Sequence, residues 1–202
     1  MKDNVFFVSG IDTNVGKSYA TGYLAKTWNE QGVRTITQKF IQTGNVGMSE
    51  DIELHRKIMG TGLLPEDESG LTMPEIFTYP CSPHLAAEID HRPIDFDKIE
   101  KATRQLSETY DAVLLEGAGG LMVPLTRDLL TIDYVVQKNY PLIFVTSGKL
   151  GSINHTLLSL EAVTRRGIRL HTVAYNLFPE EDDDIIRRDT EAYIRDLLAK
   201  EY

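Results

Sequence analysis

The residues with the clearest chemical capacity lie between Gly10 and Ser18, in the run GIDTNVGKS. Glycines let the backbone turn so that its N–H groups point inward around phosphate oxygens. Lys17 has the reach to bind the β and γ phosphates, and the Ser18 hydroxyl is a hard oxygen ligand suited to Mg²⁺. The run therefore predicts a loop that binds a nucleotide triphosphate together with Mg²⁺.

The surroundings of this run support that interpretation. The apolar residues 5–9, VFFVS, predict a strand before it, and a helix is expected to begin near Lys17. Unpaired N–H groups at the start of that helix favour an anion. Five residues separate Gly10 from Gly16 where the common motif has four, and Ile11 stands where its first glycine would be. This departure from the common motif limits the protein families to which the loop can belong.

A second metal-binding group is expected at the end of a neighbouring strand, where ligands bind in open α/β sheets. Glu116 has this position, since it follows the apolar run 112–115 and leads into the glycine-rich turn 117–120. Asp51 lies near the start of a predicted helix and is either a helix cap or a further carboxylate beside Mg²⁺. Composition alone leaves both interpretations of Asp51 open.

The elements that must position these residues alternate between apolar, β-rich runs and segments of helical periodicity. This alternation predicts an α/β fold of P-loop NTPase type, doubly wound, with a mostly parallel sheet and helices on both faces, in a single domain 1–202. Strands are expected at residues 5–9, 34–38, 112–115, 142–146 and 171–175, and helices at 17–31, 50–59, 96–110, 153–166 and 183–200. Residues 60–83 are rich in proline and form either a substrate lid or a tolerated insertion.

Composition limits the partners and the compartment. A formal net charge of -9 argues against nucleic acid and against an anionic membrane surface, because both attract basic proteins. The single cysteine, Cys81, has no partner for an intramolecular disulfide, which favours a reducing compartment. No apolar run approaches the ~20 residues of a membrane span. We therefore expect a cytoplasmic protein with small-molecule partners.

Several further motifs occur in a fixed order along residues 4–177, and together with the phosphate loop they resemble the dethiobiotin synthetase family. They are Lys39 followed by Thr43-Gly44, Asp51 in SEDIEL, Ser82-Pro83-His84, EGAGG at 116–120, GKLGSINH at 148–155, and Asn176. The run EGAGGLMVPL is the most specific piece after the phosphate loop. The resemblance covers most of the chain and rests on no single motif.

The resemblance implies ATP- and Mg²⁺-dependent carboxylation and ring closure of 7,8-diaminononanoate with CO₂, in biotin biosynthesis. One amine traps CO₂ as a carbamate, the carbamate oxygen attacks the γ phosphate, and the second amine displaces phosphate from the mixed carbamic-phosphoric anhydride. Two anions must then meet, and Lys17, Lys39 and Mg²⁺ offset their repulsion. Lys39 and Lys17 are the catalytic candidates; an exposed lysine that merely ends an edge strand is the alternative for Lys39.

The same resemblance assigns the remaining site residues and implies a homodimer in which part of the substrate site comes from the other subunit. Nucleotide-binding positions are Asn14, Val15, Gly16, Lys17, Ser18, Tyr19, Asp51, Glu116, Gly117, Ala118, Gly119 and Asn176, the last facing the base. Substrate-binding positions are Thr13, Lys39, Thr43, Gly151, Ser152 and Asn154, and the metal ligands are Ser18, Asp51 and Glu116.

Three departures from the family pattern concern Phe40, Leu177 and Tyr202. Phe40 replaces a proline after the catalytic lysine, and Leu177 replaces an acidic residue after the base-reading asparagine. The sequence ends at Tyr202 without the proline-containing segment that helps to hold adenine in longer members, so we expect a relaxed nucleotide preference that includes GTP or CTP.

A partner-regulated ATPase of the MinD and ParA kind is the chief alternative function. Such proteins carry an additional lysine at the start of the phosphate loop, where this chain has Asp12. A small-molecule kinase is a weaker alternative, since residues 35–103 contain only two arginines, Arg56 and Arg92, and no arginine-rich lid.

Overall fold

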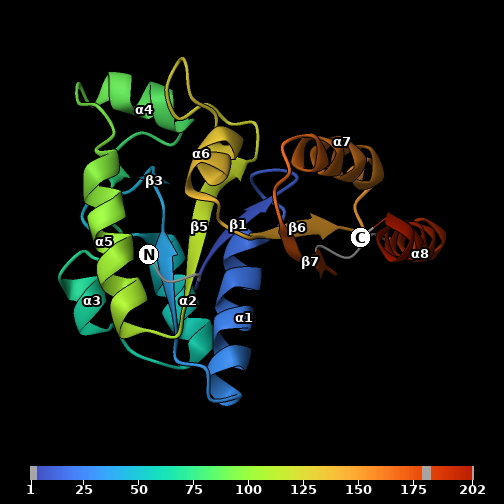
Figure 1. The fold of residues 1–202 in the computed structure, drawn as a ribbon, viewed down its shortest axis with the longest axis horizontal. Coiled ribbons are helices and arrows are strands. Elements are labelled where there is room, and N and C mark those ends of the chain that lie inside the picture. The colour runs from blue at the N-terminus through green and yellow to red at the C-terminus, as the bar shows by residue number, and fades with distance from the viewer. Residues whose placement is uncertain (1–3, 179–182, 202) are drawn as a thin grey trace.

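A five-stranded parallel sheet forms the centre of the protein in a computed structural model that describes residues 4–178 and 183–201 (Figure 1). The strand order is β2-β5-β1-β6-β7, and every pairing in this sheet is parallel. The strands are β1 (Val5–Gly10), β2 (Thr35–Lys39), β5 (Ala112–Gly120), β6 (Leu142–Ser147) and β7 (Leu170–Asn176). Because the strands run in the same direction, their carboxyl ends lie at one edge, where Lys39 pairs in register with Glu116.

Helices cover both faces of the sheet, as the alternating sequence pattern predicts. Successive residues of β1 point to opposite faces. Phe7 belongs to the larger core cluster, which also contains side chains of α5 (Phe96–Thr109), α6 (Thr131–Lys138) and α7 (Ser152–Arg165). Val8 belongs to the smaller cluster, which contains Ala25 of α1 (Lys17–Glu30). Helix α2 (Glu50–Met59) packs against α1 and β2.

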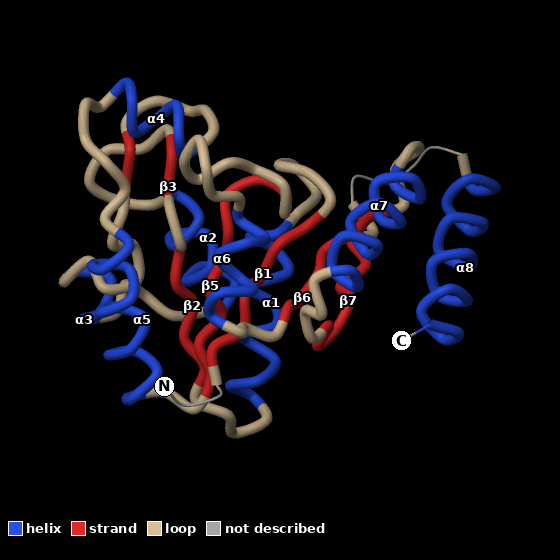
Figure 2. The backbone as a smooth tube through the Cα atoms, turned by 45° about the horizontal axis from the view of Figure 1, so that its top comes forward, coloured by secondary structure: helices blue, strands red, loops and turns tan. Residues whose placement is uncertain are grey.

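Shorter elements lie at the margins of the sheet. A parallel pair of two-residue strands, β3 (Gln42–Thr43) and β4 (Ile76–Phe77), follows β2, and α3 (Pro65–Glu68) and α4 (Pro83–Ile89) flank β4 in the chain. The last helix, α8 (Asp184–Glu201), lies beside α7 beyond the β7 edge (Figure 2). No helix among the described residues has the length and apolarity to cross a membrane.

The predicted elements are confirmed with shifts of one or two residues, except at the end of β5. We expected a flexible turn from residue 117, but β5 continues to Gly120, which pairs with Gly10 of β1. Strand pairing is possible there because the residues are small: a Cβ at Gly117 would lie 2.9 Å from the ring of Phe7. Helices α3, α4 and α6 and strands β3 and β4 are additions to the prediction. Residue 202, on which the expected nucleotide preference partly rests, lies outside the described residues.

Candidate active site

The phosphate-binding loop connects β1 to α1 at the carboxyl edge of the sheet. Gly16 is the N-cap of α1 with φ 94°, a left-handed conformation that favours glycine. A Cβ at Gly10 would lie 2.6 Å from Val15 Cγ1, so the turn also requires a glycine there. The loop thus exposes the first N–H groups of a helix to the space above the sheet, which suits a phosphate.

Lys17 lies within this loop and is buried. Its Nζ donates hydrogen bonds to the carbonyl oxygens of Asp12 at 2.7 Å and Thr13 at 3.0 Å. Burial lowers the pKa of Lys17 to about 8, although the negative charge of Glu116 opposes the shift. The ammonium therefore lies inside the loop, where a bound phosphate would stabilise its charged form.

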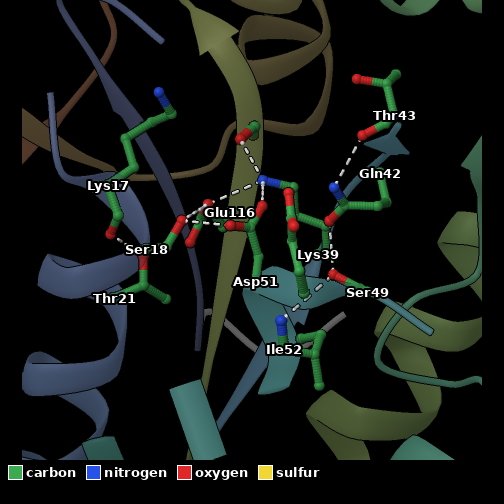
Figure 3. Close-up of polar contacts among 12 residues, drawn as sticks. Lys17, Ser18, Thr21, Lys39, Gln42, Thr43, Ser49, Asp51, Ile52 and Glu116 are labelled. Atoms are coloured by element: carbon green, nitrogen blue, oxygen red, sulfur yellow. Dashed lines mark hydrogen bonds and ion pairs between the residues drawn. The ribbon is translucent and has the colours of Figure 1, made fainter. Parts of the chain in front are cut away.

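Three oxygen-bearing side chains converge from three elements (Figure 3). The Ser18 hydroxyl, on the first turn of α1, lies 2.7 Å from Asp51 Oδ1 of α2 and 2.9 Å from Glu116 Oε1 of β5. Asp51 is available for this role because Ser49 is the N-cap of α2, accepting a hydrogen bond from the N–H of Ile52. The structure thus favours the site carboxylate over the helix cap. Two carboxylates and a hydroxyl are hard oxygen donors of the kind that Mg²⁺ binds.

Lys39, at the end of β2, reaches the same two carboxylates. Its Nζ forms ion pairs with Asp51 Oδ2 and with Glu116 Oε1, the latter at 2.9 Å, and lies 3.3 Å from the carbonyl oxygen of Gly117. Strand β2 is an edge strand of the sheet, but the side chain of Lys39 is only 6% exposed, which contradicts the interpretation of Lys39 as a solvated surface lysine. Burial disfavours the charged form, yet the charges of Glu116 and Asp51 prevail and raise the pKa of Lys39.

Glu116 is the most enclosed member of this group, with no exposed surface. Burial alone would raise its pKa, but the charge of Lys39 and the hydrogen bond from His55 hold the pKa of this carboxyl well below its usual range. His55 Nε2 lies 2.8 Å from Glu116 Oε2, while Oε1 faces Lys39 and Ser18. Glu116 is therefore a carboxylate whose two oxygens have different partners.

A cavity of about 500 Å³ collects most of the predicted site residues. The end of the proline-rich segment 60–83 also lines it, through Pro80, Cys81, Ser82 and Pro83, so this segment contributes to the site and is more than a tolerated insertion. Burial raises the pKa of the Cys81 thiol, consistent with a structural role. The predicted residues around the cavity are Thr13, Asn14, Lys17, Ser18, Lys39, Thr43, Asp51, Glu116, Ala118 and Gly119.

A second, more apolar groove of about 820 Å³ runs from the phosphate loop between α1 and β7. Four predicted residues line it: Asn14, Gly16, Tyr19 and Asn176. Asn176 Nδ2 donates to the carbonyl oxygen of Val15 at 2.8 Å, so this side chain also supports the phosphate loop directly. The groove therefore connects the phosphate-binding loop with Asn176, the residue expected to face the nucleotide base.

The predicted substrate residues Gly151, Ser152 and Asn154 do not line the cavity of their own chain. They lie at the start of α7, where Gly151 is the N-cap with φ 93° and Asn154 is exposed. Ser152 is buried, and its hydroxyl lies 3.0 Å from that of Ser147. Within one chain these three positions are separate from the convergent group.

Sequence reasoning missed His55, although a signal for it existed. His55 follows Asp51 by four residues on α2, and residues spaced i and i+4 share one face of a helix. Placing Asp51 in the site therefore also placed His55 near it. Within the described residues, no group of three or more His, Cys, Asp or Glu side chains is arranged to hold a metal, so a metal here would need Ser18 and the nucleotide as further ligands.

Comparison with known proteins gives consistent matches along the chain. A family model described as an AAA domain matches residues 4–199. The chain is 54% identical over 196 residues to "ATP-dependent dethiobiotin synthetase BioD 2" of Pasteurella multocida, covering 97% of this chain and 92% of that protein. It is 57% identical over 184 residues to the protein of the same name in Haemophilus influenzae, covering 91% and 96%. "ATP-dependent dethiobiotin synthetase BioD" of Chlorobaculum tepidum is 54% identical over 185 residues, covering 92% and 77%.

Solved structures support the fold. Chloroplast FtsY from Physcomitrella patens has a TM-score of 0.53 at 17% identity, covering 98% of this chain and 57% of that chain. A ParA family ATPase from Chlorobium tepidum has a TM-score of 0.50 at 12% identity, covering 94% and 81%. At such identities the likeness concerns the fold alone, and it agrees with the predicted P-loop NTPase architecture.

Proposed function

Because this chain belongs to the dethiobiotin synthetase family, it is an ATP-dependent ligase of biotin biosynthesis, and we propose how its site residues divide that reaction among them. The observation that carries the proposal is the convergence of Lys39, Ser18, Asp51 and Glu116 beside the phosphate-binding loop. Residues 1–202 act in it as one P-loop unit.

The two buried lysines serve different anions. Lys17 leaves its carbonyl partners in the loop and binds the β and γ phosphates of ATP. Lys39 stabilises the carbamate formed from 7,8-diaminononanoate and CO₂, and the negative charge that develops as the carbamate oxygen attacks the γ phosphate. This attack displaces ADP and forms the carbamic-phosphoric anhydride. The second amine then attacks the carbonyl carbon of the anhydride, which closes the ring and releases phosphate. Both ammonium groups reduce the repulsion between the reacting anions, which is the main barrier to bringing them together.

Ser18, Asp51 and Glu116 are the proposed ligands of Mg²⁺. The Ser18 hydroxyl lies within hydrogen-bonding distance of both carboxylates, which fits a small hard cation that also takes phosphate and water oxygens. When bound, Mg²⁺ would neutralise phosphate charge and fix the orientation of the triphosphate. Lys39 contacts both carboxylates, so binding of Mg²⁺ by Asp51 and Glu116 would weaken at least part of these ion pairs.

The cavity and the groove beside the phosphate-binding loop are proposed to bind the two organic substrates. Thr13 and Thr43 line the 500 Å³ cavity together with Lys39. We propose that their hydroxyls hydrogen-bond the diamine or its carbamate. The apolar groove lined by Tyr19 and Asn176 is proposed to receive the nucleoside.

A homodimer would account for the positions of Gly151, Ser152 and Asn154, which lie outside the cavity of their own chain. Leu150 and Leu158, beside and within α7, are 74% and 60% exposed, as an apolar contact surface would be in one isolated chain. Light scattering on the purified protein tests the dimer, and a monomer that retains full turnover would contradict it. The reducing compartment suggested by Cys81 leads us to propose the cytoplasm.

The alternative function, a partner-regulated ATPase, is supported by fold likeness alone. The ParA family ATPase shares 12% identity with this chain, whereas two relatives with the synthetase name share more than half of their aligned residues with it. Fold likeness at such distance does not specify function.

The decisive experiment mixes purified protein with diaminononanoate, bicarbonate, Mg²⁺ and ATP and follows ADP release. We expect ADP release that depends on the diamine, with dethiobiotin detected by mass spectrometry in equal amount. ATP hydrolysis at the same rate without the diamine would contradict the proposed chemistry. Lys17→Ala is expected to weaken both nucleotide binding and turnover.

A further inference from the structure

We propose that His55 is a positioning residue for Glu116, holding Oε2 so that Oε1 alone is presented to the cavity. The proposal rests on the metal-binding role of Glu116 proposed above. His55 is fully buried on α2, and its Nε2 lies 2.8 Å from Glu116 Oε2. The other oxygen, Oε1, lies 2.9 Å from both Lys39 Nζ and Ser18 Oγ. The two carboxylate oxygens of Glu116 therefore have different roles: Oε2 is held by His55, and Oε1 faces Lys39 and Ser18.

The direction of the hydrogen bonds follows from the donors available. A carboxylate only accepts, so His55 Nε2 carries the proton in the bond to Glu116. On the other side of the ring, Nδ1 lies 3.1 Å from the Thr37 hydroxyl, and that hydroxyl accepts a hydrogen bond from Arg56 NH1 at 2.8 Å. Thr37 keeps its single hydrogen and can donate it to Nδ1. We therefore infer the Nε2–H tautomer, in which both ring nitrogens have a partner.

A buried ion pair fixes the far end of this chain of hydrogen bonds. Arg56 binds Asp67 through two bonds of 2.8 Å, from Nε to Oδ2 and from NH2 to Oδ1. Thr72 Oγ1 donates to Asp67 at 2.6 Å and the Leu64 N–H donates at 2.8 Å. The planar guanidinium therefore has a single orientation, in which one N–H of NH1 is directed at the Thr37 hydroxyl.

Strand β2 and helix α2 each contribute two residues to the hydrogen bonds and ion pairs around Glu116. Thr37 and Lys39 are two residues apart on β2 and face the same side, as alternate residues of a strand do. Lys39 contacts Oε1 directly, and Thr37 acts on Oε2 through His55. On α2, His55 contacts Glu116, and Asp51, one turn earlier, shares Lys39 with it. This double support explains why a polar histidine occupies a fully buried helix position.

Two variants of His55 test the proposal by a measurement that needs no turnover. His55→Leu keeps a side chain of similar bulk but removes the donor, whereas His55→Gln keeps an N–H near the position of Nε2. Calorimetry measures Mg²⁺ binding in the presence of the non-hydrolysable analogue adenylyl imidodiphosphate. We expect His55→Leu to weaken Mg²⁺ binding about 10- to 100-fold, the usual effect of losing a group that orients a metal ligand, and His55→Gln to restore most of it.

Equal Mg²⁺ affinity in His55→Leu and the wild type would overturn the proposal, and so would a folded His55→Gln variant as weak as His55→Leu. If His55→Leu does not fold, Thr37→Val and its control Thr37→Ser apply the same test with His55 present. NMR of ¹⁵N-histidine-labelled wild type is a second, independent readout, in which an Nδ1–H tautomer of His55 would also contradict it. A wild type without diamine-dependent turnover would instead contradict the proposed function and leave the tautomer measurable.

Discussion

The Lys39 and Arg56 ion pairs combine the same groups, a buried cation and a carboxylate, in different surroundings. Arg56 and Asp67 form two parallel hydrogen bonds, and further donors saturate the carboxylate. Lys39 instead shares Asp51 and Glu116 with the Ser18 hydroxyl, beside a cavity. The Arg56–Asp67 pair therefore has fixed partners, which suits a structural role. The ion pairs of Lys39 have exchangeable partners, which suits a group that binds a reacting anion.

The two pairs are connected through a short polar route. Thr37 accepts from Arg56 and contacts His55, which in turn contacts Glu116. The fixed pair therefore orients a residue of the exchangeable one. Variants that affect stability and turnover separately can test this distinction.

The largest expected effect is on stability, at the fixed pair. Arg56→Ala leaves the buried carboxylate of Asp67 without its cation and should lower the free energy of unfolding by about 3–5 kcal/mol. Urea denaturation followed by circular dichroism measures the change. The double variant Arg56→Met with Asp67→Leu removes both charges and is expected to recover most of the loss. A loss below about 1 kcal/mol for Arg56→Ala would mean that the pair has no supporting role.

At the exchangeable pair the expected effect is on the reaction. Lys39→Ala should reduce kcat about 10²- to 10³-fold, about 2.7–4 kcal/mol in activation free energy, because the developing charge loses a preorganised donor. Nucleotide binding should change little, since Lys17 and the loop remain. Steady-state kinetics and calorimetry measure the two quantities, and Lys101→Ala, an exposed lysine of α5, is the control. Near-normal turnover in Lys39→Ala would remove its catalytic assignment.

The difference between the pairs also explains what the sequence could predict. Recognisable strands or helices begin or end at Lys39, Ser18 and Glu116. Because the carboxyl ends of parallel strands meet at one end of the sheet, the sequence alone predicted that these three residues lie close together. Asp51 stayed open between two roles until the structure showed that Ser49 caps α2. The main architecture followed in the same way from apolar strands and helical periodicity.

The fixed pair carried no such signal. Arg56 and Asp67 are separated by a helix end and an irregular segment, and only the folded path of residues 60–72 brings them together. The continuation of β5 through residues 117–120 was hidden for a similar reason, since glycines predict a turn unless a neighbouring strand pairs with them. Short elements such as β3 and β4 depend on each other and have too few residues for a periodic pattern.

A smaller effect is expected from Phe40, the residue that follows Lys39. Phe40 is fully buried, with its ring 4.6 Å from that of Tyr134 and 5.6 Å from that of Phe7, and its N–H donates to the Glu116 carbonyl at 2.8 Å. Phe40→Leu keeps the N–H and much of the volume, so we expect a loss of about 1 kcal/mol in the free energy of unfolding.

Phe40→Pro introduces the proline expected from the family pattern but removes that N–H as well as the ring, so it should be less stable than Phe40→Leu. Thermal denaturation of the two variants and the wild type gives the order. If Phe40→Pro were the more stable of the two, the aromatic cluster and the hydrogen bond would not be what holds the chain beside Lys39.

The smallest effect concerns the pH dependence of stability and isolates the charge of the fixed pair. Burial opposes ionisation of Asp67, but hydrogen bonds from Arg56 and Thr72 outweigh it and lower the pKa of this carboxyl. A carboxyl with a lower pKa in the folded state stabilises the protein above its unfolded pKa of about 3.9, and this contribution is lost as pH falls through the folded value. Asp67→Asn should therefore lose less stability than the wild type between pH 5 and pH 3, which are about one unit either side of that value.

Urea denaturation at the two pH values measures this difference, with Asp189→Asn as a control that removes an exposed carboxylate of α8. The comparison uses the change with pH within each variant, because Asp67→Asn also weakens the bidentate contact with Arg56 at every pH. The control should keep the acid sensitivity of the wild type. Equal acid sensitivity in Asp67→Asn and the wild type would show that the pair is held by hydrogen-bond geometry and that its charge adds little, which would place it closer to a neutral network than to the charged pair at Lys39.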